Sequence, residues 1–219
     1  MKKCVILLTI FAAFSVTGCK SNEEKANELI RAELFKTLYD FNSYEPIKTT
    51  IIPAKNIAIN DSMCCARALI LYFLNIDMLE RFSKALNAAE QAEIWGPPSY
   101  WSSSFSDRKY YQYRNEVRTH IKALKISAAN YNKHIDTLKN LRFNLDTTMI
   151  IGWEVMHIYR CKTKGGDSEI VNSKYIIESD FSKIIRYTDL DSEEYQAITG
   201  IFNNIDKGIA IDEKALSNL

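Results

Sequence analysis

Two long stretches of heptad-spaced apolar residues constrain the fold of this chain more than any other feature. The first begins near Asn60 and runs toward Trp95, and the second begins within 102–107 and runs to about Asn140. Apolar residues recur in both at alternating spacings of three and four, which is typical of helices packed lengthwise on each other. We therefore expect an antiparallel helical hairpin over about 61–140. Its seams are Cys65, Leu69, Tyr72, Ile76 and Leu79 in the first helix, and Tyr110, Tyr113, Val117, Ile121, Leu124, Ala128, Tyr131, Ile135 and Leu138 in the second.

The loop that joins the two predicted helices gathers large aromatic side chains. Gly96 and Pro97 end the first helix, since glycine suits helix ends and proline cannot continue a helix. Aromatic side chains exposed at the far end of a hairpin would form a contact surface for a protein, a sugar or a membrane. The alternative is that they pack on one another and on the helix ends. The residues of this surface are Trp95, Tyr100, Trp101 and Phe105.

The segments on either side of the hairpin predict a small sheet with helices. Residues 23–41 have the apolar spacing of a helix, and Asp191 begins a capping-box pattern for a last helix over about 192–206. Four segments are rich in β-branched and aromatic residues, which favours strands. These segments are 47–59, 148–161, 168–178 and 183–187.

Together these elements predict an α+β fold. An N-terminal helix would cover an antiparallel sheet of about four strands, with the hairpin inserted between the first and second strands and a helix at the C-terminus. Residues 23–219 would form a single domain around this sheet.

The N-terminus carries the features of a lipid-anchored export signal. Lys2 and Lys3 precede an almost wholly apolar run over 5–14, which is too short to span a bilayer. Val16-Thr17-Gly18-Cys19 follows and resembles the lipobox of bacterial lipoproteins. The resemblance implies cleavage after Gly18, removal of residues 1–18, and lipid on Cys19, with residues 19–22 as anchor and tether. The alternative is an ordinary secretory signal with an incidental cysteine.

The resemblance also sets an expected location. A lipoprotein is held on a membrane by the lipid on its cysteine, and two or more acyl chains give stable anchoring. Because Lys20 follows Cys19, the aspartate that retains some lipoproteins at the inner membrane is absent. We expect the cell envelope, at the outer membrane, with either the periplasmic or the surface face. Glu23-Glu24 resembles acidic surface-export signals, or forms an acidic first helical turn.

Two blocks of sequence are similar to an uncharacterised lipoprotein family of gut anaerobes of the Bacteroidales type. The first runs from Phe35 to Ile47 and contains Ser43-Tyr44-Glu45-Pro46, and the second runs from Gly152-Trp153-Glu154-Val155 to Gly166. No activity is assigned to such families, so the resemblance implies no residue roles.

Composition favours a folded chain without a nucleic-acid partner. Of its 219 residues, 47% are hydrophobic and only four are proline, which is typical of globular proteins. Lys2 and Lys3 are the only charges in 1–18, so the rest of the chain has 26 basic and 27 acidic residues. No basic block stands out, and we expect no nucleic-acid partner.

The histidines predict neither a metal site nor a cofactor. His120 and His134 lie fourteen residues apart in one predicted helix, about 21 Å, so they cannot bind one ion. His157 shares a strand face with Trp153 and is more typical of a core histidine than of a base. Were the sheet face open, Trp153, His157 and Tyr175 would line a ligand pocket on it.

Three cysteines remain besides Cys19. The envelope is oxidising, so Cys161 could pair with Cys64 or Cys65 and join the base of the hairpin to the sheet. Three unpaired buried cysteines are the alternative.

Three hypotheses for function follow. The first is a non-enzymatic envelope lipoprotein whose hairpin presents aromatic side chains to an envelope or surface protein. The second is a ligand-binding or inhibitor module, including an immunity-type protein, that uses the sheet face. The third is a hydrolase, which would need convergent polar groups with perturbed pKa values. Glu154 and Glu169 could face each other across a hairpin of strands and supply a carboxylate pair, or, as is usual for cross-strand glutamates, face water near Lys or Arg.

Overall fold

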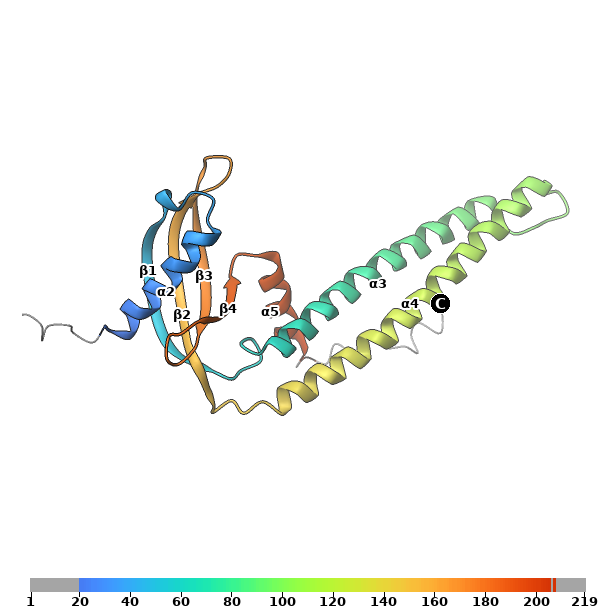
Figure 1. Ribbon diagram of the computed structural model, residues 1–219. Coiled ribbons are helices and arrows are strands. Elements are labelled where there is room, and N and C mark those ends of the chain that lie inside the picture. The colour runs from blue at the N-terminus through green and yellow to red at the C-terminus, as the bar shows by residue number, and fades with distance from the viewer. Residues whose placement is uncertain (1–19, 206, 208–219) are drawn as a thin grey trace, which may run out of the picture. The chain divides into compact units, whose positions relative to one another are not determined.

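The computed structural model describes residues 20–205 and residue 207. The chain divides into two compact units, and Figure 1 shows their elements. The sheet unit contains the described residues up to Lys55 and Ile150–Asp191. The helical unit contains Asn56–Met149 and the described residues from Ser192 onward.

The sheet unit is a four-stranded antiparallel sheet with one long helix. Its helical elements are α2 (Asn22–Thr37) and the short 3-10 helix η1 (Phe41–Ser43), and its strands are β1 (Glu45–Lys55), β2 (Ile150–Lys162), β3 (Ser168–Ile177) and β4 (Ile184–Asp189). The strand order is β1-β2-β3-β4, so consecutive strands lie side by side. Pro53 lies on β1, an edge strand, where a residue without an N–H is tolerated.

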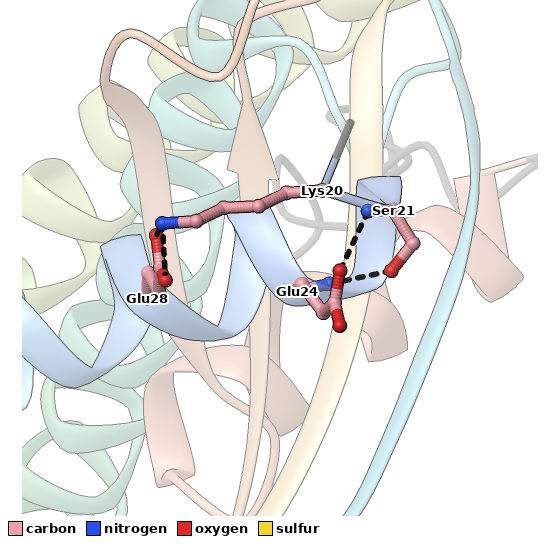
Figure 2. Close-up of polar contacts among 4 residues, drawn as sticks. All are labelled: Lys20, Ser21, Glu24 and Glu28. Carbon is pink, nitrogen blue, oxygen red and sulfur yellow. Dashed lines mark hydrogen bonds and ion pairs between the residues drawn. The ribbon is translucent and has the colours of Figure 1, made fainter. Parts of the chain in front are cut away.

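Helix α2 begins with the capping box shown in Figure 2. The Ser21 hydroxyl accepts a hydrogen bond from the Glu24 backbone N–H (3.1 Å), and the Glu24 carboxylate accepts one from the Ser21 N–H (2.7 Å). These bonds satisfy backbone donors that a helix start otherwise leaves unpaired. Lys20 adds an ion pair with Glu28 at 2.6 Å. Glu24 therefore has a structural role in the first turn of the helix.

Helix α2 buries one apolar stripe against the sheet, as its sequence pattern predicts. Ala26, Ile30 and Leu34 form the helix side of this core. The sheet side consists of alternate residues of β2 and β3, because successive side chains of a strand point to opposite faces. These are Val155, Tyr159, Cys161, Tyr175 and Ile177.

The helical unit contains two long helices and a short one. They are α3 (Ser62–Trp95), α4 (Ser104–Phe143) and α5 (Glu193–Ile205), and α5 packs against α3. Asp61 caps α3 by accepting a hydrogen bond from the Cys64 N–H (2.7 Å), and Ser103 caps α4 in the same way. Thus the predicted hairpin and the α+β class are both confirmed. The grouping of α5 with the hairpin is a feature that the sequence pattern does not indicate.

The seam of α3 lies one residue away from the predicted one. The buried residues of α3 are Cys64, Cys65, Ala68, Leu71, Met78, Ala85, Ala88 and Ala92. Of the predicted seam, Leu69 and Tyr72 are only partly buried, and Ile76 and Leu79 are exposed. Apart from Cys65, which is buried, the predicted seam of α3 is therefore wrong, because this helix is apolar on two neighbouring sides and the heptad period does not choose between them. On α4, the predicted residues from Leu124 to Leu138 are buried.

Candidate functional site

The end of the hairpin combines packed and exposed aromatic side chains. The rings of Trp95 and Phe105 meet edge to face at 5.6 Å, across the two helix ends. Tyr100 and Trp101 also meet edge to face, at 5.2 Å, but are 93% and 89% exposed. Trp95 and Phe105 therefore pack on each other across the helix ends, with Phe105 still 50% exposed, whereas Tyr100 and Trp101 are almost fully exposed. We call Trp95, Tyr100, Trp101 and Phe105 the aromatic tip.

Hydrogen bonds of serine side chains hold the loop that carries Tyr100 and Trp101. The Ser102 hydroxyl accepts from the Ser99 N–H (3.0 Å) and donates to the Ser99 carbonyl oxygen (2.8 Å). Ser103 then caps α4 by accepting from the Ser106 N–H (3.1 Å). Because the two exposed rings lie between these bonds, the loop presents them in a defined conformation.

Charges of both signs border the aromatic tip. Arg108 and Lys109 lie over the Phe105 ring, at 5.8 and 6.0 Å from its centroid. Glu93 is exposed near the end of α3, and Asp107 lies in the first turn of α4. The tip thus offers aromatic faces surrounded by cations and carboxylates, which is a common composition for protein contact surfaces.

His157 lies in a hydrogen-bond chain beneath α2. Its Nε2 is 3.0 Å from the Tyr44 hydroxyl, and its Nδ1 is 2.9 Å from the Thr49 hydroxyl. Thr49 in turn donates to the Asn27 side-chain oxygen at 2.8 Å. Because Thr49 uses its only proton on Asn27, it accepts from His157 Nδ1–H. The tautomer assigned in this way leaves Nε2 to accept from Tyr44.

The surroundings of His157 keep its ring neutral. Burial lowers the pKa of His157 to about 4, because the charged imidazolium would lose its hydration. Both ring nitrogens have partners, and the side chain is 1% exposed. These features describe a satisfied core histidine. Tyr44, Thr49 and Asn27 face an open cleft of about 290 Å³ that Arg31 also lines, and no spacing in the sequence links them to His157.

The other two residues of the predicted pocket lie on the same sheet face. Tyr175 is 1% exposed, and its ring meets that of His157 at 6.5 Å. Its hydroxyl is buried without a hydrogen-bond partner among the described residues, and burial raises its pKa. Trp153 stacks on Phe181 at 5.8 Å and donates to the Ser179 carbonyl oxygen (3.2 Å). Side chains of the unit's own core occupy the positions that a ligand would take.

The described cysteines Cys64, Cys65 and Cys161 form no disulfide in the structure, so the pairing of Cys161 with Cys64 or Cys65 is not seen. Cys64 and Cys65 belong to the core of the helical unit, and Cys161 belongs to the core of the sheet unit. The Cys65 sulfur lies 3.4 Å from the Ile59 carbonyl oxygen. Burial raises the pKa of Cys64 to about 12, so this thiol stays protonated and unreactive.

The structure argues against a carboxylate pair on the sheet. Glu154 pairs with Ile176 and Glu169 pairs with Cys161, so the two glutamates lie far apart along the β2–β3 ladder. The hypothesis that they face each other is wrong, because the turn at 163–167 sets a different register. Within the described residues, no group of three or more His, Cys, Asp or Glu side chains could hold a metal ion.

The lipobox residues Gly18 and Cys19 lie outside the described residues. Among the described helices, α3 is long and apolar enough to cross a membrane by length and composition, and a little over a quarter of its most apolar window is buried. No known protein family, curated protein or solved structure matches this chain.

Proposed function

We propose that this protein is a lipid-anchored lipoprotein of the bacterial cell envelope whose helical hairpin binds a partner protein through the aromatic tip. The observation that carries the proposal is the near-complete exposure of Tyr100 and Trp101 on a loop held by hydrogen bonds. Tyrosine and tryptophan are the residues that most often dominate binding energy at protein interfaces. They lose little conformational entropy on binding, because each has only two side-chain torsions.

The charges near the tip favour a protein over a lipid surface as the partner. Segments that lie in an anionic membrane surface have a polar face rich in Lys and Arg. Here Arg108 and Lys109 alternate with carboxylates, since Asp107 precedes them and Glu93 lies on the facing helix end. A protein surface can place complementary charges opposite both signs, whereas an anionic bilayer surface attracts only the cations.

Photo-crosslinking in cells tests the tip. A photoreactive phenylalanine analogue at position 100 of the full chain should yield a light-dependent adduct with one envelope protein. Trp101→Ala should abolish the adduct, and should weaken binding to the purified partner by about 30-fold or more, as for an interface hot spot. Phe143→Ala is the matched control, because Phe143 is an 88% exposed aromatic residue at the other end of α4. An adduct that survives Trp101→Ala would contradict the proposal.

A separate experiment tests the anchor. Cells fed an alkyne-labelled fatty acid should label the full chain, and Cys19→Ser should remove both the label and the protein's recovery with membranes. Cys161→Ser is the control, since this thiol is buried in the sheet unit. Label retained in Cys19→Ser would contradict lipidation at this residue. Protease treatment of intact cells then decides whether the protein faces outward or inward.

A further inference from the structure

The open polar cleft of the sheet unit lies between α2 and the segment that leads into β1. Its volume is about 290 Å³, which is close to that of the smallest sites that proteins use for small molecules. Helix α2 provides one wall, and residues 44–49 provide the other. The residues that line the cleft are Asn27, Glu28, Arg31, Tyr44, Pro46 and Thr49. The cleft therefore has room for a molecule of about the size of one sugar ring.

The α2 wall of the cleft presents hydrogen-bond donors. Asn27 and Arg31 lie four residues apart, so their side chains are neighbours on one face of the helix. The Asn27 side-chain oxygen accepts from Thr49 (2.8 Å), and the two N–H groups of the same amide have no partner within the described part of the chain. Arg31 forms no ion pair with a described residue, and both oxygens of the neighbouring Glu28 accept from Lys20. The Glu28 charge is thus neutralised, and the Arg31 charge is left for an anion.

Aromatic rings position the Arg31 guanidinium group at the cleft. The group lies over the Phe41 ring, 5.7 Å from its centroid, and the Phe41 ring stacks on that of Tyr44 at 5.4 Å. Burial raises the pKa of the Tyr44 hydroxyl, and the positive charge of Arg31 opposes this rise, so the charge acts on both walls of the cleft. A guanidinium that lies on an aromatic ring keeps its N–H edge free, and this edge matches the two oxygens of a carboxylate.

The opposite wall presents hydroxyl oxygens that accept hydrogen bonds. Tyr44 donates its proton to His157 Nε2 (3.0 Å), and Thr49 donates its own to Asn27. Neither hydroxyl has a second proton to give, but each oxygen keeps a lone pair for a donor on a ligand. His157 is 1% exposed and contacts both hydroxyls, so a group in the core of the unit holds this wall in a fixed geometry.

We propose that this cleft binds a small hydroxy acid. The carboxylate of the ligand accepts from Arg31 and Asn27, and its hydroxyl groups donate to the oxygens of Tyr44 and Thr49. A neutral sugar leaves the Arg31 charge without an anion, and a simple inorganic anion leaves the hydroxyl wall without donors, so each of them makes fewer of these bonds. The site does not depend on the proposed role of the aromatic tip, because the tip belongs to the helical unit.

Ligand-observed NMR with the full chain in detergent tests the site. The probes are lactate and D-glucuronate, which are a small and a large hydroxy acid, and D-glucose is the matched compound without a carboxylate. D-glucuronate should give a saturable response, and D-glucose should bind at least about tenfold more weakly, since it lacks the charge-assisted hydrogen bonds. Absence of a saturable response to both acids, or equal binding of D-glucuronate and D-glucose, would overturn the proposal.

Substitutions on α2 assign the binding to this cleft. Arg31→Gln should weaken binding of the acid that responds by about tenfold or more, and Arg114→Gln is the matched control, because Arg114 is an exposed arginine of α4. Asn27→Asp keeps an oxygen that accepts from Thr49 but replaces both free donors with a negative charge, so it should weaken binding at least as much. Circular dichroism melting should show that all three variants fold. Equal effects of Arg31→Gln and Arg114→Gln, or unchanged binding in Asn27→Asp, would show that the acid binds elsewhere and that the proposal is wrong.

Discussion

At the scale of single residues, His157 shows how burial determines the protonation state of a side chain. Its pKa of about 4 lies below the usual value of 6.5, so the unfolded chain takes up a proton at a higher pH than the folded chain does. The stabilisation from neutral His157 is complete above about pH 6.5 and is lost as the pH falls toward 4. The loss is at most about 3 kcal/mol. We expect the His157 ring resonances to stay unchanged in NMR spectra from pH 8 to 5.5.

In the same pH titration, His134 serves as the control for His157. His134 has a pKa lowered by partial burial and by the nearby Arg67, but it lies on α4, away from the His157 chain of hydrogen bonds. Thr49→Val removes the acceptor for His157 Nδ1–H and should shift the His157 resonances while leaving those of His134 in place. A His157 midpoint near 6.5 in the unsubstituted chain would show that the ring is hydrated.

Replacement of Gly152 should strongly destabilise the sheet. Its φ is +147°, and a Cβ built there would lie 2.1 Å from the Ile177 carbonyl oxygen of the neighbouring strand. Gly152→Ala should therefore lower the free energy of unfolding by about 2–4 kcal/mol in denaturant melts. Gly200→Ala is the control, since Gly200 lies in α5 with open space around it, and alanine there should stabilise by about 0.5–1 kcal/mol. Equal effects of the two substitutions would contradict the close approach at Gly152.

At the scale of elements, alanines set how closely α3 and α4 approach. Ala85, Ala88 and Ala92 are buried, whereas the neighbouring Ala89 is exposed. Ala88→Leu should push the helices apart and destabilise the protein by about 1–3 kcal/mol. Ala89→Leu should change stability by less than about 0.5 kcal/mol, as at other surface positions. Thermal melts of the two variants distinguish the seam seen in the structure from one shifted by a residue, which would reverse their order.

At the scale of the whole molecule, two separate cores predict two separately unfolding units. Leu71 belongs to the core of the helical unit and Ile177 to that of the sheet unit, and both are fully buried. Leu71→Ala and Ile177→Ala should each cost about 2–5 kcal/mol. Hydrogen exchange measured by mass spectrometry should show faster exchange in α4 for Leu71→Ala and in β2 and β3 for Ile177→Ala. Faster exchange in both units for either variant would show that the chain unfolds as one cooperative body.

The sequence by itself determined the elements and their class. The heptad spacing of the two long helices, Gly96 and the prolines after it, and the change to a period of two after residue 140 are local signals. Each acts through neighbouring residues along the chain, so the hairpin, the four strands and the helix stripe at Ala26, Ile30 and Leu34 could be predicted. The loop sequence allowed the rings of Tyr100 and Trp101 either to be exposed or to pack on the helix ends. It does not specify which aromatic rings pack against other side chains.

Tertiary structure decided between arrangements that the local sequence allows equally well. Both sides of α3 have the same period, and only packing against α4 selects the row with Cys64, Leu71 and the alanines, because small residues allow the closest contact. The residues of the His157 hydrogen-bond chain, Asn27, Thr49 and Tyr44, come from α2, β1 and the segment between them, and all three lie more than a hundred residues from His157. Likewise, the register of β2 and β3 separates Glu154 from Glu169. Such relations depend on distances between segments remote in the chain, which periodicity along a single segment does not contain.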